Sequence, residues 1–263
     1  MNPSPICLRL LTVLLRGVLL LVLLARGADA AEGPPLKALV ISGGCCHDYK
    51  KLLPHLTTNI SAMVKVTFEV KYDLEILDNE KFAEPFDVLI FDQCQEEGTA
   101  MQVRNALAAV RAGKPTVMIH CALHAFKSSS DWRDCCGMTS KVHDPFQAFD
   151  TEKLDSAHPI TKSFPEDWKT AGDELYQTIK MGEHSHPLLK VKSPHSGKEH
   201  IVCWTNTYGK ARVFATTLGH DMKTASDPRY QRLLANGLLW ACGKLDAQGQ
   251  AAAGYAVSGQ PEK

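Results

Sequence analysis

The sequence lacks an excess of charge of either sign, because 29 lysine and arginine residues balance 29 aspartate and glutamate residues. A protein that binds nucleic acid needs a basic face to displace counterions from phosphates, so this balance argues against that class. The 263-residue chain also does not have the composition of a disordered protein, since 44% of its residues are hydrophobic and 22% are charged. These proportions are typical of a globular protein, and the sequence contains no internal repeat.

Several well-known site motifs are absent as well. Gly43-Gly44 is not part of a G-x-G-x-x-G pattern and precedes no P-loop lysine, which favours a tight strand-to-helix turn over a phosphate cradle. The sequence has neither H-E-x-x-H nor paired C-x-x-C spacing. A zinc-type site would therefore need histidine and aspartate ligands from distant segments.

Only one segment is apolar enough to enter a membrane, and it lies at the N-terminus. Arg9 precedes a long apolar stretch, and Ala28-Asp29-Ala30 has the small-x-small pattern of a signal-peptidase site. An uncleaved anchor is the alternative, but Arg16 splits the stretch into halves shorter than the roughly 20 apolar residues that a span needs. We therefore predict a signal peptide over 1–30, no stable membrane span after its removal, and a periplasmic or extracellular protein.

Export permits disulfide bonds, although the cysteines are too sparse for a small disulfide-stapled fold. Two adjacent pairs, Cys45-Cys46 and Cys135-Cys136, lie in predicted loops and could form bridges. The sequence leaves their pairing open.

Apolar runs and helical periods alternate along the first half of the chain. The predicted buried strands are Lys37–Ser42, Asp87–Asp92 and Thr116–His120, and the alternating segment Lys65–Tyr72 is a further predicted strand. The predicted helices are Leu52–Met63 and Glu97–Ala112. This alternation predicts an α/β fold with βαβ units and a mostly parallel sheet.

The second half has a different pattern. Residues 127–195 are polar and rich in proline and histidine, so we expect a small insertion with short antiparallel strands. Tyr208-Gly209-Lys210 separates the predicted strands His200–Thr207 and Arg212–Leu218, which is typical of a hairpin. Asp227–Gly243 is a predicted helix with Asp227 as its N-cap. We predict one domain over 31–245 and a disordered tail over 246–263, where apolar periodicity is absent.

Polar side chains gather where the predicted strands end. In open parallel sheets, ligands bind outside the carboxyl ends of the strands, which lie at one edge. The polar residues at four such ends are His47, His120, His124, His220, Asp48, Asp92 and Asp221. Each of them alone could be an ordinary loop or core residue, but together they predict a polar pocket at this edge.

Further candidates have two interpretations each. Cys121 follows a predicted strand, as the nucleophile of an elbow would, but no glycine flanks it, which favours a packed thiol. His120 and His124 are four positions apart and would face one metal ion on a helix, although His120 belongs to the predicted strand. Asp173 or Glu174 could be a general base or bind sugar hydroxyls. Three tryptophans could stack on sugar rings or simply pack in the core: Trp132, Trp168 and Trp204.

A series of short motifs occurs in order between about Lys37 and Leu245. They are Gly44-x-x-His47-Asp48-Tyr49, His120-x-Ala122-x-His124-x-Phe126, Trp132, Cys136-Gly137-Met138, His143, His158-Pro159-Ile160, Asp173-Glu174-Leu175-Tyr176 and the run from Tyr208 to Asp221. Together they resemble the ThuA-like, or trehalose-utilisation, family. The resemblance implies a flavodoxin-like three-layer sandwich of the class I glutamine amidotransferase type, with a small antiparallel insertion, and a role in carbohydrate metabolism.

The strand-end cluster and the resemblance together give the expected site. The expected catalytic residues are His120, His124 and Asp221. The expected substrate-binding residues are His47, Asp48, Asp92, Glu174 and His220. The candidate ligands for a divalent metal such as zinc are His47, His124 and His220. Glutamine hydrolysis is disfavoured, because Cys121 lacks elbow glycines and His220-Asp221 is not the His-x-Glu of the amidotransferases.

We therefore expect an exported enzyme that acts on a sugar or sugar derivative by acid–base or metal-assisted chemistry, since imidazole titrates near neutral pH. A non-catalytic sugar-binding module is the alternative, and a thiol enzyme that uses Cys121 is a third hypothesis. The sequence leaves the substrate, the metal and the oligomeric state open.

Overall fold

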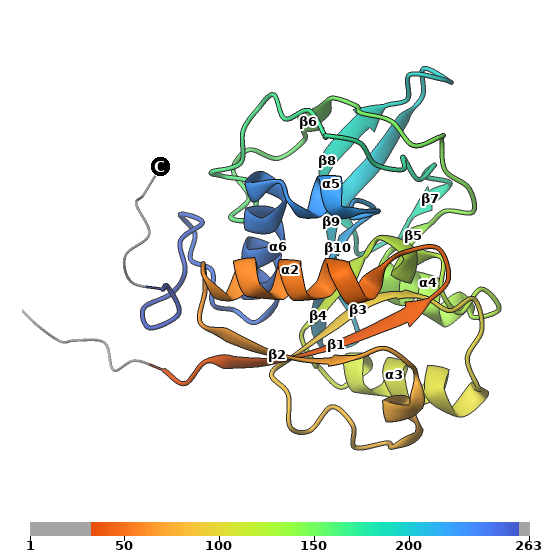
Figure 1. Ribbon diagram of the computed structural model, residues 1–263, viewed down its shortest axis with the longest axis vertical. Coiled ribbons are helices and arrows are strands. Elements are labelled where there is room, and N and C mark those ends of the chain that lie inside the picture. Colours follow the sequence, from red (N-terminus) through yellow and green to blue (C-terminus); the bar gives the residue numbers. More distant parts are fainter. Residues whose placement is uncertain (1–32, 258–263) are drawn as a thin grey trace, which may run out of the picture. The chain divides into compact units, whose positions relative to one another are not determined.

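The computed structural model describes residues 33–257 (Figure 1). They form an eight-stranded sheet in the order β2-β1-β3-β4-β10-β9-β8-β6 and a two-stranded sheet, β5-β7. The predicted signal peptide at 1–30 lies outside the described residues and stays a prediction. Within the described range, no helix combines the length and apolar character needed to cross a membrane.

The large sheet has a parallel and an antiparallel part. The parallel strands are β1 (Leu36–Gly44), β2 (Val66–Lys71), β3 (Val88–Cys94), β4 (Thr116–Ile119) and β10 (Ala211–Thr216). The antiparallel strands are β9 (Glu199–Tyr208), β8 (His186–Lys192) and β6 (Thr151–Lys153). The small sheet pairs β5 (Met138–Thr139) with β7 (Lys180–Met181).

The helices are α2 (Tyr49–Ser61), α3 (Ala100–Arg111), α4 (Ser130–Cys136), α5 (Met222–Ala225) and α6 (Pro228–Ala241). Two 3-10 turns, η1 (Glu75–Asp78) and η2 (His120–Leu123), complete the set. The predicted α/β fold, its hairpin and the insertion with short antiparallel strands are confirmed. Helix α4, inside the insertion, was not expected from the polar sequence there.

Both faces of the parallel sheet are buried, which explains the continuous apolar runs. Along β1, Ala38 and Val40 belong to one core cluster, whereas Leu39 and Ile41 belong to the other. Helices α2 and α6 contribute to the first cluster, and α3 and α4 contribute to the second, so the helices cover opposite faces of the sheet (Figure 1). The result is the predicted three-layer arrangement.

Parallel pairing aligns the strand ends. Gly44, the last residue of β1, pairs with Cys94, the last residue of β3, and Thr216 of β10 pairs with Ile119 of β4. The segments that follow these strands therefore begin at the same edge of the sheet. The order β2-β1-β3-β4 is that of flavodoxin-like folds, in which ligands bind at this edge.

Residues of the predicted disordered tail pair with the rest of the chain, so the prediction of disorder is wrong for them. Tyr255 accepts a hydrogen bond from the Lys65 backbone N–H at 2.8 Å, and Ala256 forms an antiparallel bridge with Val64. Backbone pairing needs no apolar period, so the sequence pattern did not reveal it.

The structure also decides between the two interpretations of the tryptophans. Trp132, Trp168 and Trp204 are all fully buried. They therefore pack in the core and do not stack on a ligand.

Candidate functional site

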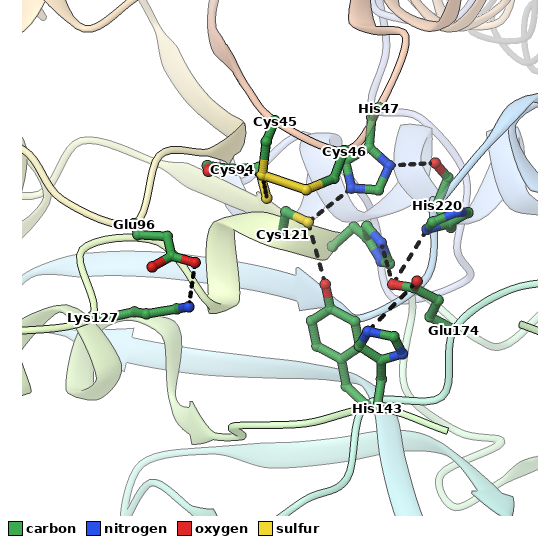
Figure 2. The surroundings of a disulfide bond; sticks show 12 residues. Cys45, Cys46, His47, Cys94, Glu96, Cys121, Lys127, His143, Glu174 and His220 are labelled. Carbon is green, nitrogen blue, oxygen red and sulfur yellow. Dashed lines mark hydrogen bonds and ion pairs between the residues drawn. A yellow bond between two sulfur atoms is a disulfide. The ribbon is translucent and has the colours of Figure 1, made fainter. Parts of the chain in front are cut away.

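A pocket of about 470 Å³ opens at the edge where the parallel strands end. The strand-end segments contribute Cys45, Cys46, His47, Cys94, Cys121, His124 and His220 to its lining. The insertion and neighbouring loops contribute Glu96, Lys127, Lys141, Val142, His143, Glu174 and Tyr176. Figure 2 shows the sulfur atoms gathered beside His47, with Glu174 between His143 and His220.

The His47 ring bridges two strand-end loops. Its Nδ1 lies 2.8 Å from the backbone oxygen of His220, and its Nε2 lies 2.9 Å from Cys121 Sγ. A carbonyl oxygen can only accept a hydrogen bond, so Nδ1 carries the proton. In the neutral ring, Nε2 is therefore the acceptor, and the Cys121 thiol donates to it.

His120 occupies a special backbone position at the end of β4. Its φ angle is +47°, in the left-handed region that non-glycine residues adopt rarely and at a cost. The residue at the sharp turn between β4 and η2 is thus His120, not Cys121. Its ring is almost fully buried, and Nδ1 donates to the Thr217 backbone oxygen at 2.5 Å. Nε2 then faces the Glu174 carboxylate at 3.4 Å.

Glu174 is the centre of a group of imidazoles. Its Oε2 lies 3.4 Å from His120 Nε2 and 3.3 Å from His220 Nδ1, and its Oε1 lies 3.6 Å from His143 Nε2. Burial alone would raise the pKa of Glu174, but the imidazoles of His120 and His220 hold it well below its usual range. The carboxylate in turn raises the pKa of His220. Glu174 is therefore an ionised carboxylate surrounded by imidazoles.

The buried Asp173 holds this group in place. Its carboxylate accepts backbone N–H groups from Gly219 at 2.9 Å, His220 at 3.3 Å and Glu174 at 2.8 Å. Complete burial raises the pKa of Asp173, although His120 and the N–H groups of Gly219 and Glu174 oppose the rise. Asp173 thus joins the insertion to the loop after β10 without facing the pocket.

His124 stacks on the Tyr176 ring at the pocket wall. The ring centroids are 4.1 Å apart, and the planes differ by 7°. Burial, together with the nearby His120 and His143, lowers the pKa of His124 to about 4. His124 is therefore a neutral pocket residue at physiological pH.

The three predicted aspartates lie elsewhere. Asp48 accepts from the Lys51 backbone N–H as the N-cap of α2, and Asp221 accepts from the Lys223 backbone N–H as the N-cap of α5. Asp92 is buried at the end of β3, where burial raises its pKa to about 7. None of the three is among the pocket-lining residues within 33–257. The structure thus groups His47, His120, His124, Glu174 and His220 but not these aspartates.

The cysteines of the pocket contribute a second chemical group. Cys45 and Cys46 form a disulfide bond, and Cys94 Sγ lies 3.6 Å from Cys45 Sγ. Cys135 and Cys136 are free and fully buried in α4. Sequence reasoning did not name Cys94, His143, Tyr176 or Lys127 as site residues. The available signals were the strand-end position of Cys94 and the presence of His143 and Tyr176 among the family motifs.

Three groups of side chains could hold a metal ion, since the ligand atoms of each lie within 4.8 Å of one another. They are Cys45, Cys46 and Cys94, whose disulfide would first have to be reduced; His47, His120 and Cys121; and His120, Glu174 and His220. The third has the imidazole and carboxylate ligands of catalytic zinc sites. Among the described residues, His124 belongs to none of these groups.

The family described as "ThuA: Trehalose utilisation" matches residues 37–241. A solved structure described as a ThuA-like protein from Parabacteroides merdae is 21% identical, covers 84% of this chain and 96% of its own, and has a TM-score of 0.69. A second from Bacteroides uniformis is 18% identical, covers 85% and 98%, and has a TM-score of 0.69.

A third structure, described as a GMP synthase component from Thermoplasma acidophilum, is 12% identical, covers 80% and 96%, and has a TM-score of 0.50. No curated protein matches the chain in sequence. At these identities the likeness shows the fold alone. The expected amidotransferase-like fold and the family resemblance are confirmed.

The lowered pKa of His124 predicts a pH-dependent stability. The pKa of His124 is 6.5 in the unfolded chain, its ordinary value, and about 4 in the folded chain. As the pH falls from about 6.5 to about 4, the unfolded state binds the proton first, so stability is lost in this window. The free energy of unfolding therefore falls between about pH 7 and about pH 4.5, and we expect His124→Gln to make this fall smaller by about 2 kcal/mol.

Urea unfolding of both proteins at the two pH values measures this difference. His184→Gln, at an exposed position, is the matched control and should leave the loss unchanged. Equal losses in the native protein and His124→Gln would contradict the prediction.

Proposed function

Because the chain belongs to the ThuA, or trehalose-utilisation, family, we propose that it is an enzyme of carbohydrate metabolism and that the strand-end pocket is its active site. The pocket is large enough for a small sugar, with about 470 Å³ of space. The observation that carries the proposal is the Glu174 carboxylate, which three imidazoles surround at the pocket wall.

This arrangement suits proton transfer to and from a sugar hydroxyl or carbonyl. Glu174, His143 and His220 line the pocket, so a bound hydroxyl could contact a carboxylate oxygen and an imidazole nitrogen together. One group takes a proton while a neighbour gives one, which is general acid–base catalysis. His120 is buried behind them and positions Glu174, because its other nitrogen is held by the Thr217 backbone oxygen.

The geometry favours this chemistry over glutamine hydrolysis. The positive φ angle expected of an elbow nucleophile belongs to His120. The Cys121 thiol is buried, and its pKa is raised by the neighbouring Cys94 and by burial. Its hydrogen bonds to His47 and Tyr176 fit a packed thiol that orients its neighbours.

We expect the protein purified from residue 31 onward to turn over a member of a panel of disaccharides and oxidised (keto) sugars. Glu174→Gln removes the negative charge but keeps the shape, so we expect kcat/KM to fall by about 100-fold or more. Product formation followed by chromatography or NMR gives this ratio.

Glu183→Gln is the matched control, because Glu183 is exposed and outside the pocket lining, and its activity should equal that of the native protein. Absence of turnover with every sugar would contradict an enzyme. Saturable sugar binding without a product would favour the sugar-binding module instead.

A metal-assisted version of the same function rests on one further observation. His120 Nε2 and His220 Nδ1 lie 3.4 and 3.3 Å from the same Glu174 oxygen, with no hydrogen-bond partner for either nitrogen among the described residues. Such spacing is close to that between neighbouring ligands about 2.0–2.1 Å from a tetrahedral zinc ion. When bound there, zinc would polarise a sugar oxygen or lower the pKa of a water molecule.

The metal-assisted version predicts about one zinc ion per chain in isothermal titration of the chelator-treated protein. Glu174→Gln and His220→Asn should each weaken binding by at least about 10-fold, because each removes one of three ligands. Cys94→Ser is the control that separates this site from the cysteines, and it should bind zinc normally. Zinc binding that survives both site substitutions but not Cys94→Ser would overturn the assignment.

The proposal includes export, which rests on residues 1–30 of the sequence. A disulfide at Cys45–Cys46 fits an oxidising compartment. N-terminal sequencing of the protein secreted by its host should begin at Ala31, and a chain that retains residues 1–30 would contradict cleavage.

A further inference from the structure

Three sulfur atoms on one wall of the pocket form a group that the proposed carbohydrate chemistry does not use. Cys45 and Cys46 are joined as a disulfide, and the Cys94 Sγ lies 3.6 Å from the Cys45 Sγ (Figure 2). All three residues line the pocket, and the residues of the disulfide are exposed. A free thiol and a disulfide therefore lie in contact and within reach of a small solute.

The backbone fixes this contact. Gly44 pairs with Cys94 in the parallel sheet, and its φ angle is +94°. A Cβ atom at Gly44 would lie 2.6 Å from the Cys94 carbonyl carbon, so only glycine permits the approach. The chain must then turn directly over Cys94, which places Cys45 against it. Cys46 follows with a φ of +80°, a costly conformation for a residue other than glycine.

Access separates Cys94 from the other free thiol of the pocket. Cys94 is only partly buried and lines the pocket beside the exposed disulfide. Thiol–disulfide exchange needs a thiolate that can reach a disulfide sulfur. By contrast, Cys121 is buried, and its sulfur is held between His47 and Tyr176.

We propose that Cys45, Cys46 and Cys94 form a thiol–disulfide exchange centre that reacts with low-molecular-weight thiols and disulfides entering the pocket. In the internal step, the Cys94 sulfur attacks the Cys45 sulfur. The Cys45–Cys94 bond forms while the Cys45–Cys46 bond breaks, and Cys46 leaves as a thiolate. One disulfide replaces another, so the step needs no oxidant or reductant.

A small thiol enters the same sequence. Its thiolate attacks Cys45, releasing Cys46 and forming a mixed disulfide on Cys45, and Cys94 then displaces the small thiolate to form Cys45–Cys94. If a second small thiol arrives first and attacks the sulfur of the bound small thiol, one small disulfide leaves and Cys45 and Cys46 remain as thiols. Two electrons and two protons then pass from two small thiols to the protein disulfide.

The centre does not depend on the proposed carbohydrate activity, and the chain contains its own reference. Cys135 and Cys136 are also adjacent in sequence, but both are fully buried in α4, and burial raises their pKa values. We expect them to stay unreactive under conditions in which the pocket cysteines exchange.

The test follows the disulfide by peptide mapping. The full chain is incubated with reduced glutathione, quenched with acid, alkylated and digested with trypsin. Exchange joins the peptide 38–50, which carries Cys45 and Cys46, to the peptide 82–104, which carries Cys94. We expect this cross-linked pair, with the alkyl group on Cys46, and its complete loss in Cys94→Ser. Native protein in which the disulfide stays at Cys45–Cys46 and Cys94 is always the alkylated residue would overturn the proposal.

Cys46→Ser gives a second readout. Without Cys46, oxidised glutathione should form a mixed disulfide that resolves to Cys45–Cys94 with release of glutathione. Adding Cys94→Ser should trap the mixed disulfide on Cys45. A persistent mixed disulfide in Cys46→Ser alone would refute internal exchange. Cys242→Ser, at a free thiol that is not among the pocket-lining residues, is the matched control and should exchange like the native chain.

Discussion

Parallel pairing of β1, β3, β4 and β10 sends four chain segments to the same edge of the sheet. Hydrogen bonding between these strands fixes their relative register, so residues far apart in the sequence become neighbours. His47 and His220 are 173 positions apart, yet the ring of one bonds to the backbone of the other. Every contact in the pocket depends on this alignment, because each functional side chain lies within a few residues of a strand end or is held against one.

The insertion completes the pocket through a single buried carboxylate. Asp173 comes from the insertion and accepts N–H groups of the loop after β10, so it fixes Glu174 relative to His220. Three N–H donors offset part of the cost of burying the acid. The pocket then has two chemically distinct walls: imidazoles around a carboxylate on one side, and sulfur atoms on the other (Figure 2). These walls support different proposals, and Cys121 with His47 lies between them.

Much of the fold could be predicted because its signals are local. Continuous apolar runs indicated the buried strands, and Asp227 before Pro228 indicated the start of α6, as observed. The gathering of histidines followed from strand direction alone. The roles of Asp48 and Asp221 did not follow from strand direction. Like Asp227, each precedes a helix and accepts a hydrogen bond from a backbone N–H of that helix. That pattern was available in the sequence and would have separated them from Glu174.

Other features depend on distances that no sequence pattern gives. The contact between Cys45 and Cys94 requires a particular register of β1 against β3 together with glycine at position 44. The positive φ angle of His120 could not be predicted either, because the same sequence pattern fits a strand end with ordinary backbone angles. Local signals therefore place the site at an edge of the sheet but do not arrange its atoms.

The pairing of residues near 255 with the segment before β2 has a consequence for how the molecule behaves among its own copies. β2 is an outermost strand, and outermost strands offer unpaired backbone groups to other chains. Ala256 covers the approach to this strand at Val64, and Glu69 and Lys71 place charges farther along it. The segment around Ala256 and the charged side chains of β2 therefore make this edge less available for pairing with a second copy of the chain.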